Sequence, residues 1–352
     1  MLTPPSFHDK RLSKTERAEV ALKSPAERQR MIETLLVRYP RHRAMSKFIA
    51  SFHRPVKDGT HDHGHIGVLL GATRSGKSWV LRDYMSAFPA VQTDGIVEKP
   101  VLFITVMDDM AAHDVIRSTF LALGYLSVPH IKTDALMAMV IEALPDHGVE
   151  LIIFDDVDNA LKSQRTGYAK KILAFIKGIL DKDCCNILCA GRSELYRILA
   201  GAEQIKGRGG LKQAVLEPYR WQFREEREQV RLLLDEIDER LPFARKSGLA
   251  DPDLAAHLYA VSGGVIGQMM NYIEPAAYEA MNDRADRIER DHLIHVAKSL
   301  MAPGTSFVPF RDKVDPQRLI DEATEKEMQA REDKVAGRLR NPFSKTRKGG
   351  FR

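Results

Sequence analysis

The chain has 352 residues, of which 44% are hydrophobic and 29% charged, and its net charge is +5. This composition is ordinary for a soluble protein and allows two or three domains. No apolar stretch approaches the roughly 18 residues of a membrane-spanning helix, and the charged N-terminus lacks the apolar core of a signal peptide. We therefore expect a cytoplasmic protein with no membrane partner.

Two compositional clusters stand out. Cys184, Cys185 and Cys189 lie close together in and beside an apolar segment, and an odd number in such a place favours reduced thiols over a disulfide framework. Residues 338–352 contain arginine and lysine but no acidic side chain. A solvated tail explains this basic cluster as well as contact with phosphates does.

The chain begins with a predicted helical extension, residues 1–53. Ser24 and Glu27 mark the start of one helix, because a serine N-cap and a glutamate three positions later can satisfy each other's backbone amides. This helix is expected to stop before Pro40, and a second helix is expected at 42–52. A polar loop containing His61, His63 and His65 follows; we interpret it as a solvated loop rather than a metal site.

Apolar segments then alternate with helical ones. Strands are predicted at 66–70, 100–106, 150–154 and 186–190, with a final core segment at 211–217. Helices are predicted at 77–87, 111–123, 133–144 and 166–181. Nearly continuous apolar strands alternating with helices indicate a parallel sheet covered on both faces. Residues 54–220 are thus predicted to form an α/β core.

The first strand leads into the spacing G-x-x-x-x-G-K-[ST], which we call the phosphate loop. Its glycines allow backbone N–H groups to approach the phosphates of ATP, and the helix after it adds its positive end. Lys77 is expected to reach the β- and γ-phosphates, and Ser78 to hold Mg²⁺. The phosphate-loop residues are Gly71, Ala72, Thr73, Arg74, Ser75, Gly76, Lys77 and Ser78.

Two carboxylates end the strand at 150–154. Asp155 is placed to bind the Mg²⁺ shell opposite Ser78, and Asp156 lies where a carboxylate that polarises the attacking water belongs. Two motifs in this order favour a nucleotide-hydrolase core. Arg192 and Ser193 follow the next strand and are candidate sensors of the γ-phosphate, although a plain turn fits this position equally well.

A basic segment precedes the last core strand. Arg208, with Lys206 as the reserve, is our candidate for a cation that reaches the nucleotide site of a neighbouring subunit and neutralises charge during phosphoryl transfer. An ordinary surface charge is the competing interpretation.

After Pro218 the pattern becomes helical. Helices are predicted at 223–239, 251–261, 265–282 and 290–300, which make residues 221–301 a helical lid. Trp221 at its start is better explained as a packing anchor between core and lid than as a base-stacking platform. Residues 302–352 form a basic tail, with one predicted helical stretch at 315–336 and the remainder partly helical or disordered.

The chain resembles an AAA+ ATPase of the TniB/TnsC type, the transposition regulators of Tn-seven-like and mercury-resistance-type transposons. Besides the phosphate loop and the strand that ends in Asp155, three segments carry the resemblance. They are Tyr39-Pro40-Arg41-His42-Arg43, Leu216-Glu217-Pro218-Tyr219-Arg220-Trp221 and Ser262-Gly263-Gly264-Val265-Ile266-Gly267.

This resemblance implies a P-loop NTPase of the AAA+ fold, with a parallel sheet flanked by helices and a C-terminal helical lid. ATP-bound subunits would form rings or helical filaments on double-stranded DNA, recruit a DDE transposase or a TniQ-like adaptor, and disassemble on hydrolysis. Loops near 107–114 and 125–133, with Arg117 and Lys132 nearby, are candidate DNA contacts.

Two departures from the family pattern bear on activity. Asp156 stands where the family usually has a glutamate, so turnover is expected to be slow; Gln268 stands where many AAA+ proteins have a lid arginine. A nucleotide-gated scaffold or initiator-like regulatory NTPase with little hydrolysis is the alternative function. A metabolic kinase would need a substrate pocket in the lid, for which the sequence has no signature.

Overall fold

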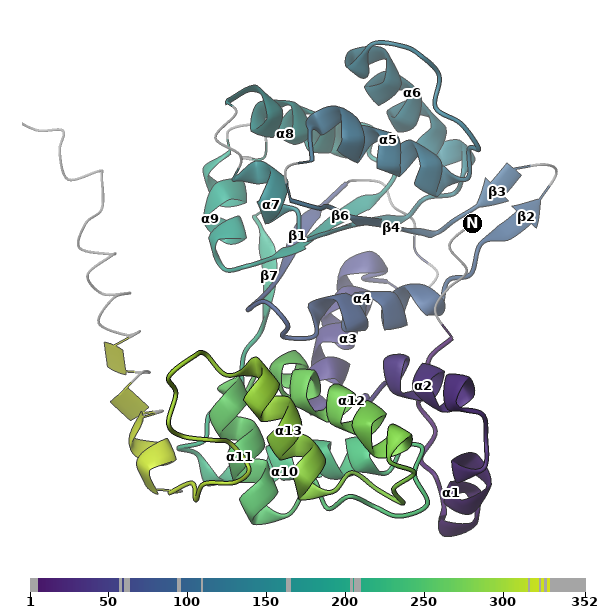
Figure 1. Ribbon diagram of the computed structural model, residues 1–352. Helices are drawn as coiled ribbons and strands as arrows, with labels where there is room; N and C mark the ends of the chain where they lie inside the picture. Colours follow the sequence, from purple (N-terminus) through teal and green to yellow (C-terminus); the bar gives the residue numbers. More distant parts are fainter. Residues whose placement is uncertain are drawn as a thin grey trace, which may run out of the picture.

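A five-stranded parallel sheet forms the centre of the computed structural model (Figure 1). The structure describes residues 6–56, 59, 64–93, 96–108, 110–162, 166–202, 205, 210–315, 317–322, 324–325 and 328–329. The strand order is β4-β5-β6-β1-β7, and all neighbouring pairs are parallel. The strands are β1 Ile66–Gly71, β4 Val101–Thr105, β5 Leu151–Asp155, β6 Asn186–Gly191 and β7 Lys212–Leu216.

Helices cover both faces of this sheet. Alternate side chains of the strands point to opposite sides, so each apolar strand contributes to two cores. One core packs against α5 Ala112–Leu123, α6 Thr133–Asp146, α8 Thr166–Asp181 and α9 Glu194–Gly201. The other packs against α3 Pro40–His53 and α4 Lys77–Ser86. The predicted parallel sheet covered on both faces is therefore confirmed.

The C-terminal helices form a second layer below the sheet in Figure 1. They are α10 Arg224–Asp238, α11 Pro252–Ser262, α12 Ile266–Asn282 and α13 Arg290–Leu300, which we call the lid helices. They share one apolar core, in which Trp221 is 5% exposed and stacks on Tyr259 at 4.6 Å between ring centroids. Trp221 is thus a packing residue, as expected, although it belongs to the lid core and to neither core of the sheet.

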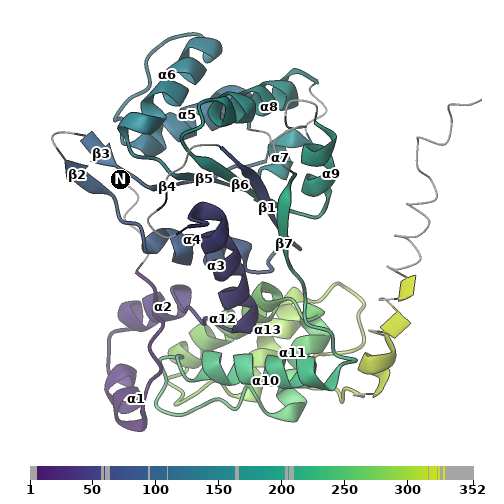
Figure 2. The ribbon, with the colours of Figure 1, turned by 180° about the vertical axis from the view of Figure 1, so that it is seen from behind.

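The N-terminal helices divide between the two layers (Figure 2). α1 Lys14–Ala21 and α2 Pro25–Glu33 lie beside the lid helices, and Ile32 and Leu35 belong to the lid core. The predicted capping box between Ser24 and Glu27 is present. Helix α3 instead packs on α4 and β7, with Ile49 and Phe52 buried in the core of the sheet.

Several short elements were not predicted. The strands β2 Val91–Thr93 and β3 Ile96–Glu98 pair as an antiparallel hairpin, and α7 Asp158–Leu161 follows β5. Helix α9 was also missed, and α3 begins at Pro40, two residues earlier than expected, because proline suits the first position of a helix. In the part of the chain that the structure describes, no helix is long and apolar enough to cross a bilayer.

Candidate functional site

The phosphate loop has the backbone conformation that its glycines predict. It joins the end of β1 to α4, and Gly76 has a φ of 100° at the N-cap of α4. A Cβ on Gly71 would lie 2.6 Å from Ser75 Oγ and 2.9 Å from the carbonyl oxygen of Leu216. A larger residue at Gly71 would displace these neighbours, and the positive φ of Gly76 is one that residues with a side chain rarely adopt. Both glycines are therefore required for the loop to close around a ligand.

Lys77 is buried at the start of α4. Its Nζ donates hydrogen bonds to the carbonyl oxygens of Gly71 at 2.9 Å and Ala72 at 3.0 Å. Burial lowers the pKa of Lys77, although the carboxylates of Asp156 and Asp155 act in the opposite direction. Neutral carbonyls are weaker acceptors than an anion. The ammonium therefore lies where a phosphate oxygen would be a better partner.

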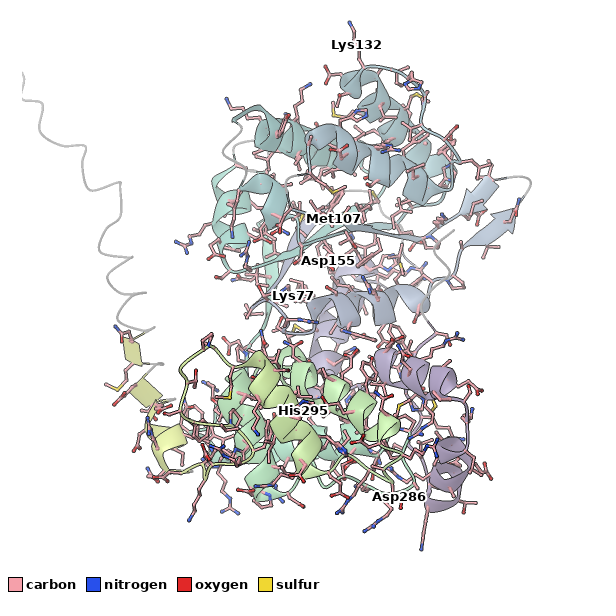
Figure 3. All side chains as sticks on the ribbon, viewed as in Figure 1. Lys77, Met107, Lys132, Asp155, Asp286 and His295 are labelled. Carbon is pink, nitrogen blue, oxygen red and sulfur yellow. The ribbon has the colours of Figure 1, made fainter. Side chains whose placement is uncertain are left out.

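Asp155 ends β5 beside this lysine (Figure 3). It is 1% exposed, and burial raises its pKa, against the effect of a hydrogen bond from Ser78. Its Oδ1 atom is buried without a hydrogen-bond partner. An unpartnered carboxylate oxygen next to a serine hydroxyl is the oxygen donor set that Mg²⁺ prefers, so these residues fit the metal that the sequence predicts.

Asp156 follows in a left-handed backbone conformation with a φ of 55°. It lines the same cavity as Lys77 and Ser78.

Among the described residues, no group of three or more histidine, cysteine or acidic side chains could hold a metal ion. His61 and His63 lie outside the described residues.

Arg192 is held in place by the buried Asp158. Its Nε donates to Asp158 Oδ2 at 2.9 Å, and its Nη2 donates to Asn159 Oδ1 at 3.3 Å. Burial raises the pKa of Asp158, but hydrogen bonds from Arg192 and Lys162 outweigh this effect and leave it below its ordinary value. The positive charge of Arg192 adds to the effect of burial in lowering the pKa of Lys77. Its predicted sensing role stays a prediction; Ser193, the other candidate, is exposed at the N-cap of α9.

The remaining predicted residues are less informative. Lys206 and Arg208 lie outside the described residues, so their role stays a prediction. Lys132 lies at the end of the molecule remote from the lid helices and from Lys77 (Figure 3), and it is therefore not part of the nucleotide site.

A cavity of about 400 Å³ extends from the phosphate loop. One end of the cavity, at Thr73 to Ser78 and Asp156, is formed by residues that the sequence motifs predict, and the other end is not. That end comes from the segment after α2 and from α12, and its lining includes Leu35, Leu36, Val37, Tyr39, His42, Ile266, Gly267, Met270 and Glu274. The apolar run Leu35-Leu36-Val37 before Pro40 was the available signal. A polar phosphate end joined to an apolar end suits a nucleotide with its base.

Glycines bring the lid helices onto the phosphate loop. The N–H of Gly267 at the start of α12 donates to the carbonyl oxygen of Arg74 at 2.9 Å, and the N–H of Tyr219 donates to the carbonyl oxygen of Gly264 at 2.9 Å. A Cβ on Gly264 would overlap the backbone of Tyr219, and one on Gly267 would overlap Arg74. The glycine motif of the lid is therefore a close-packing requirement.

The comparisons with known proteins agree with this geometry. A family model described as the AAA domain matches residues 60–208. The fold is that of an AAA+ P-loop NTPase. This confirms the predicted fold class.

Solved structures of this fold align with most of the chain. The Orc1 protein of Aeropyrum pernix in complex with DNA has a TM-score of 0.55 at 18% identity, over 80% of this chain and 68% of that one. Cdc6p from Pyrobaculum aerophilum has a TM-score of 0.52 at 14% identity, over 77% of this chain and 70% of that one. The ORC2 protein of Aeropyrum pernix in ADPNP–ADP complexes has a TM-score of 0.52 at 14% identity, over 76% of this chain and 69% of that one. No curated protein matches the chain in sequence.

Proposed function

We propose that the protein binds ATP with Mg²⁺ in the cavity beside the phosphate loop and hydrolyses it. The observation that carries this proposal is the junction of the loop, the buried Asp155 and an apolar cavity in one AAA+ fold. The ADPNP–ADP complexes of the ORC2 protein support it by analogy of fold.

Each residue has a distinct task in this proposal. Backbone N–H groups of residues 72–77 and the Lys77 ammonium hold the phosphates, while Ser78 and Asp155 hold Mg²⁺, which neutralises phosphate charge when bound. Asp156 orients and polarises the attacking water. Arg192, fixed by Asp158, senses the γ-phosphate, and Arg208 acts across a subunit interface.

The apolar end of the cavity receives the base. The backbone N–H and C=O of Val37 form no hydrogen bond within the described structure, and its side chain is 8% exposed. Such a pair of free backbone groups can read one edge of a purine. The lid helices close the other side through Ile266 and Met270.

We further propose that the protein is an ATP-dependent, DNA-binding regulator of transposition. The three segments that carry the TniB/TnsC resemblance support this assignment, because they meet at the junction of α3, β7 and α12. The Orc1 structure with DNA supports a DNA partner by analogy of fold, and a net charge of +5 favours contact with phosphates. The proposed partners are double-stranded DNA, further copies of the chain, a DDE transposase and a TniQ-like adaptor.

We retain two other expectations as proposals. The first is the division into an extension at 1–53, a core at 54–220, a lid at 221–301 and a basic tail at 302–352. The second is a cytoplasmic location.

A nucleotide-gated scaffold with little hydrolysis is the second candidate function. It is favoured by Asp156, whose side chain is one methylene shorter than the glutamate usual in the family. The two candidates share ATP binding and differ in turnover.

The test is assembly on DNA. With a non-hydrolysable ATP analogue, negative-stain images of the protein with double-stranded DNA should show rings or filaments that bind a DDE transposase, and ADP should disperse them. DNA affinity should fall steeply with salt. A salt-independent affinity, or assembly that ignores the nucleotide, would contradict the DNA-regulator proposal.

A further inference from the structure

Arg41 lies at the junction between the sheet and the lid helices. It comes from α3, the helix that packs on α4 and β7. Its Nη1 donates to the carbonyl oxygens of Glu217 at 2.5 Å and Pro218 at 2.8 Å, which belong to the linker between β7 and α10. Its guanidinium carbon lies 4.0 Å from the centre of the Tyr219 ring.

The same side chain also reaches the first lid helix. Arg41 Nη2 donates to Glu226 Oε2 at 2.5 Å. Glu226 is 8% exposed and accepts two more hydrogen bonds from Arg220. The Arg220 backbone N–H donates one at 2.8 Å, and Arg220 Nε donates the other at 2.7 Å. One arginine of the N-terminal region therefore ties together α3, the linker and α10.

These contacts are continuous with the phosphate loop. The ring of Tyr219 lies under the guanidinium of Arg41, and its backbone N–H donates to the carbonyl oxygen of Gly264. Gly267, three residues after Gly264, donates its N–H to the carbonyl oxygen of Arg74 in the loop. The side chain of Gln268, at the start of α12, instead accepts a hydrogen bond from Asn271 at 2.9 Å. The lid helices thus contact the loop at this point through backbone atoms, whose position depends on how the linker is held.

We propose that Arg41 is a positioning residue that holds the lid helices against the phosphate loop and thereby sets the affinity for nucleotide. The second half of this statement rests on the proposed function, ATP binding. Arginine is needed because only a planar fork of donors can bond two carbonyls and a carboxylate while stacking on a ring. Without it the linker is free to swing, and Ile266 and Met270 leave the wall of the cavity.

The test uses the whole 352-residue chain with Arg41→Ala, Glu226→Gln and both changes together. Lys47→Ala is the matched control, because Lys47 is exposed on the same helix and forms no hydrogen bond or ion pair in the described structure. Arg41→Ala should raise the ATP Kd and KM by roughly 10- to 100-fold, the range for losing a charge-assisted hydrogen bond. The kcat should stay within about threefold, since the reacting groups are untouched.

Two further readouts separate positioning from general loss of structure. Amide hydrogen exchange should accelerate in peptides covering 262–270 but not in those covering α8, which packs on the far face of the sheet. The double variant should bind ATP no more weakly than Arg41→Ala alone, because both changes release the same contact. If Arg41→Ala fails to fold, Glu226→Gln alone decides the matter, with a smaller rise in Kd and the same local exchange.

An ATP Kd within about twofold of wild type in a folded Arg41→Ala protein, or unchanged exchange around Gly267, would overturn the proposal. An equal rise in Kd for Lys47→Ala would do the same. If the wild type binds no nucleotide, the proposed function fails, while the exchange of the nucleotide-free protein still decides whether Arg41 positions the lid helices.

Discussion

Replacing Asp155 by asparagine should stabilise the nucleotide-free protein and abolish its catalysis. Asp155 is 1% exposed, and its Oδ1 has no hydrogen-bond partner. A buried, unsatisfied polar atom costs about 1–3 kcal/mol, and more when it is charged. Asparagine keeps the shape and the acceptor for Ser78, and its unpartnered NH2 takes the place of Oδ1, so the substitution removes the buried charge but not the missing hydrogen bond. We expect the free energy of unfolding to rise by about 1–2 kcal/mol, which corresponds to a few degrees in Tm.

The sign of the pH dependence follows from the pKa of Asp155. Burial raises this pKa above its ordinary value of 3.8, so the folded state binds the proton more tightly than the unfolded state does. The penalty is absent below the unfolded pKa, grows as the pH rises through the folded pKa, and is complete above it. The stability advantage of Asp155→Asn should therefore be largest above the folded pKa of Asp155 and should shrink as the pH falls through it.

Thermal unfolding with and without Mg²⁺ and ATP is the assay. Ligand that binds only the folded state adds about 2.7 kcal/mol at 100 times its Kd. Wild type should gain this stabilisation when Mg²⁺ and ATP are both present, and Asp155→Asn should lose the part that depends on Mg²⁺. A nucleotide-free Asp155→Asn protein that is less stable than wild type, or one that Mg²⁺ with ATP stabilises equally well, would refute the reasoning.

Three other results are expected. Asp156→Asn should keep ATP binding and lower turnover by about 100-fold or more, the scale of a lost general base; unchanged turnover would support the scaffold instead. Arg208→Ala should spare ATP binding by monomers and reduce hydrolysis by assembled protein about 1,000-fold, and equal rates for the two proteins would remove its role. Burial raises the pKa of Glu226, but Arg220 and Arg41 outweigh this and hold it below its ordinary 4.5. Its stabilising contribution should thus persist above pH 4.5 and disappear in stronger acid, so acid titration of Arg41→Ala should show a weaker loss of stability than wild type.

Most of the fold could be read from the sequence because its signals are local. The strands around Leu69 and Ile153 are continuous apolar runs, which only a doubly covered sheet buries. The phosphate loop and the carboxylates of Asp155 and Asp156 follow their strands directly. The β2–β3 hairpin was missed because its strands have three residues each and are largely exposed.

The apolar end of the cavity and the contacts of Arg41 could not be predicted from the sequence, because both depend on contacts between distant segments. Arg41 meets Glu226, which lies 185 positions later, and nothing in the pattern of either helix indicates the other. The segment around Val37 lines the cavity because α2 and the residues after it pack on the lid helices. Such contacts follow from tertiary packing and not from local periodicity.

Calorimetric titration of the folded wild-type chain with Mg²⁺ and ATP tests the central claim most directly. We predict saturable binding at one site per chain, accompanied by a change in the emission of Trp79, which lines the cavity, and both signals should be absent in Lys77→Ala. A folded wild-type protein that gives no binding signal with either ATP or ADP would contradict the account.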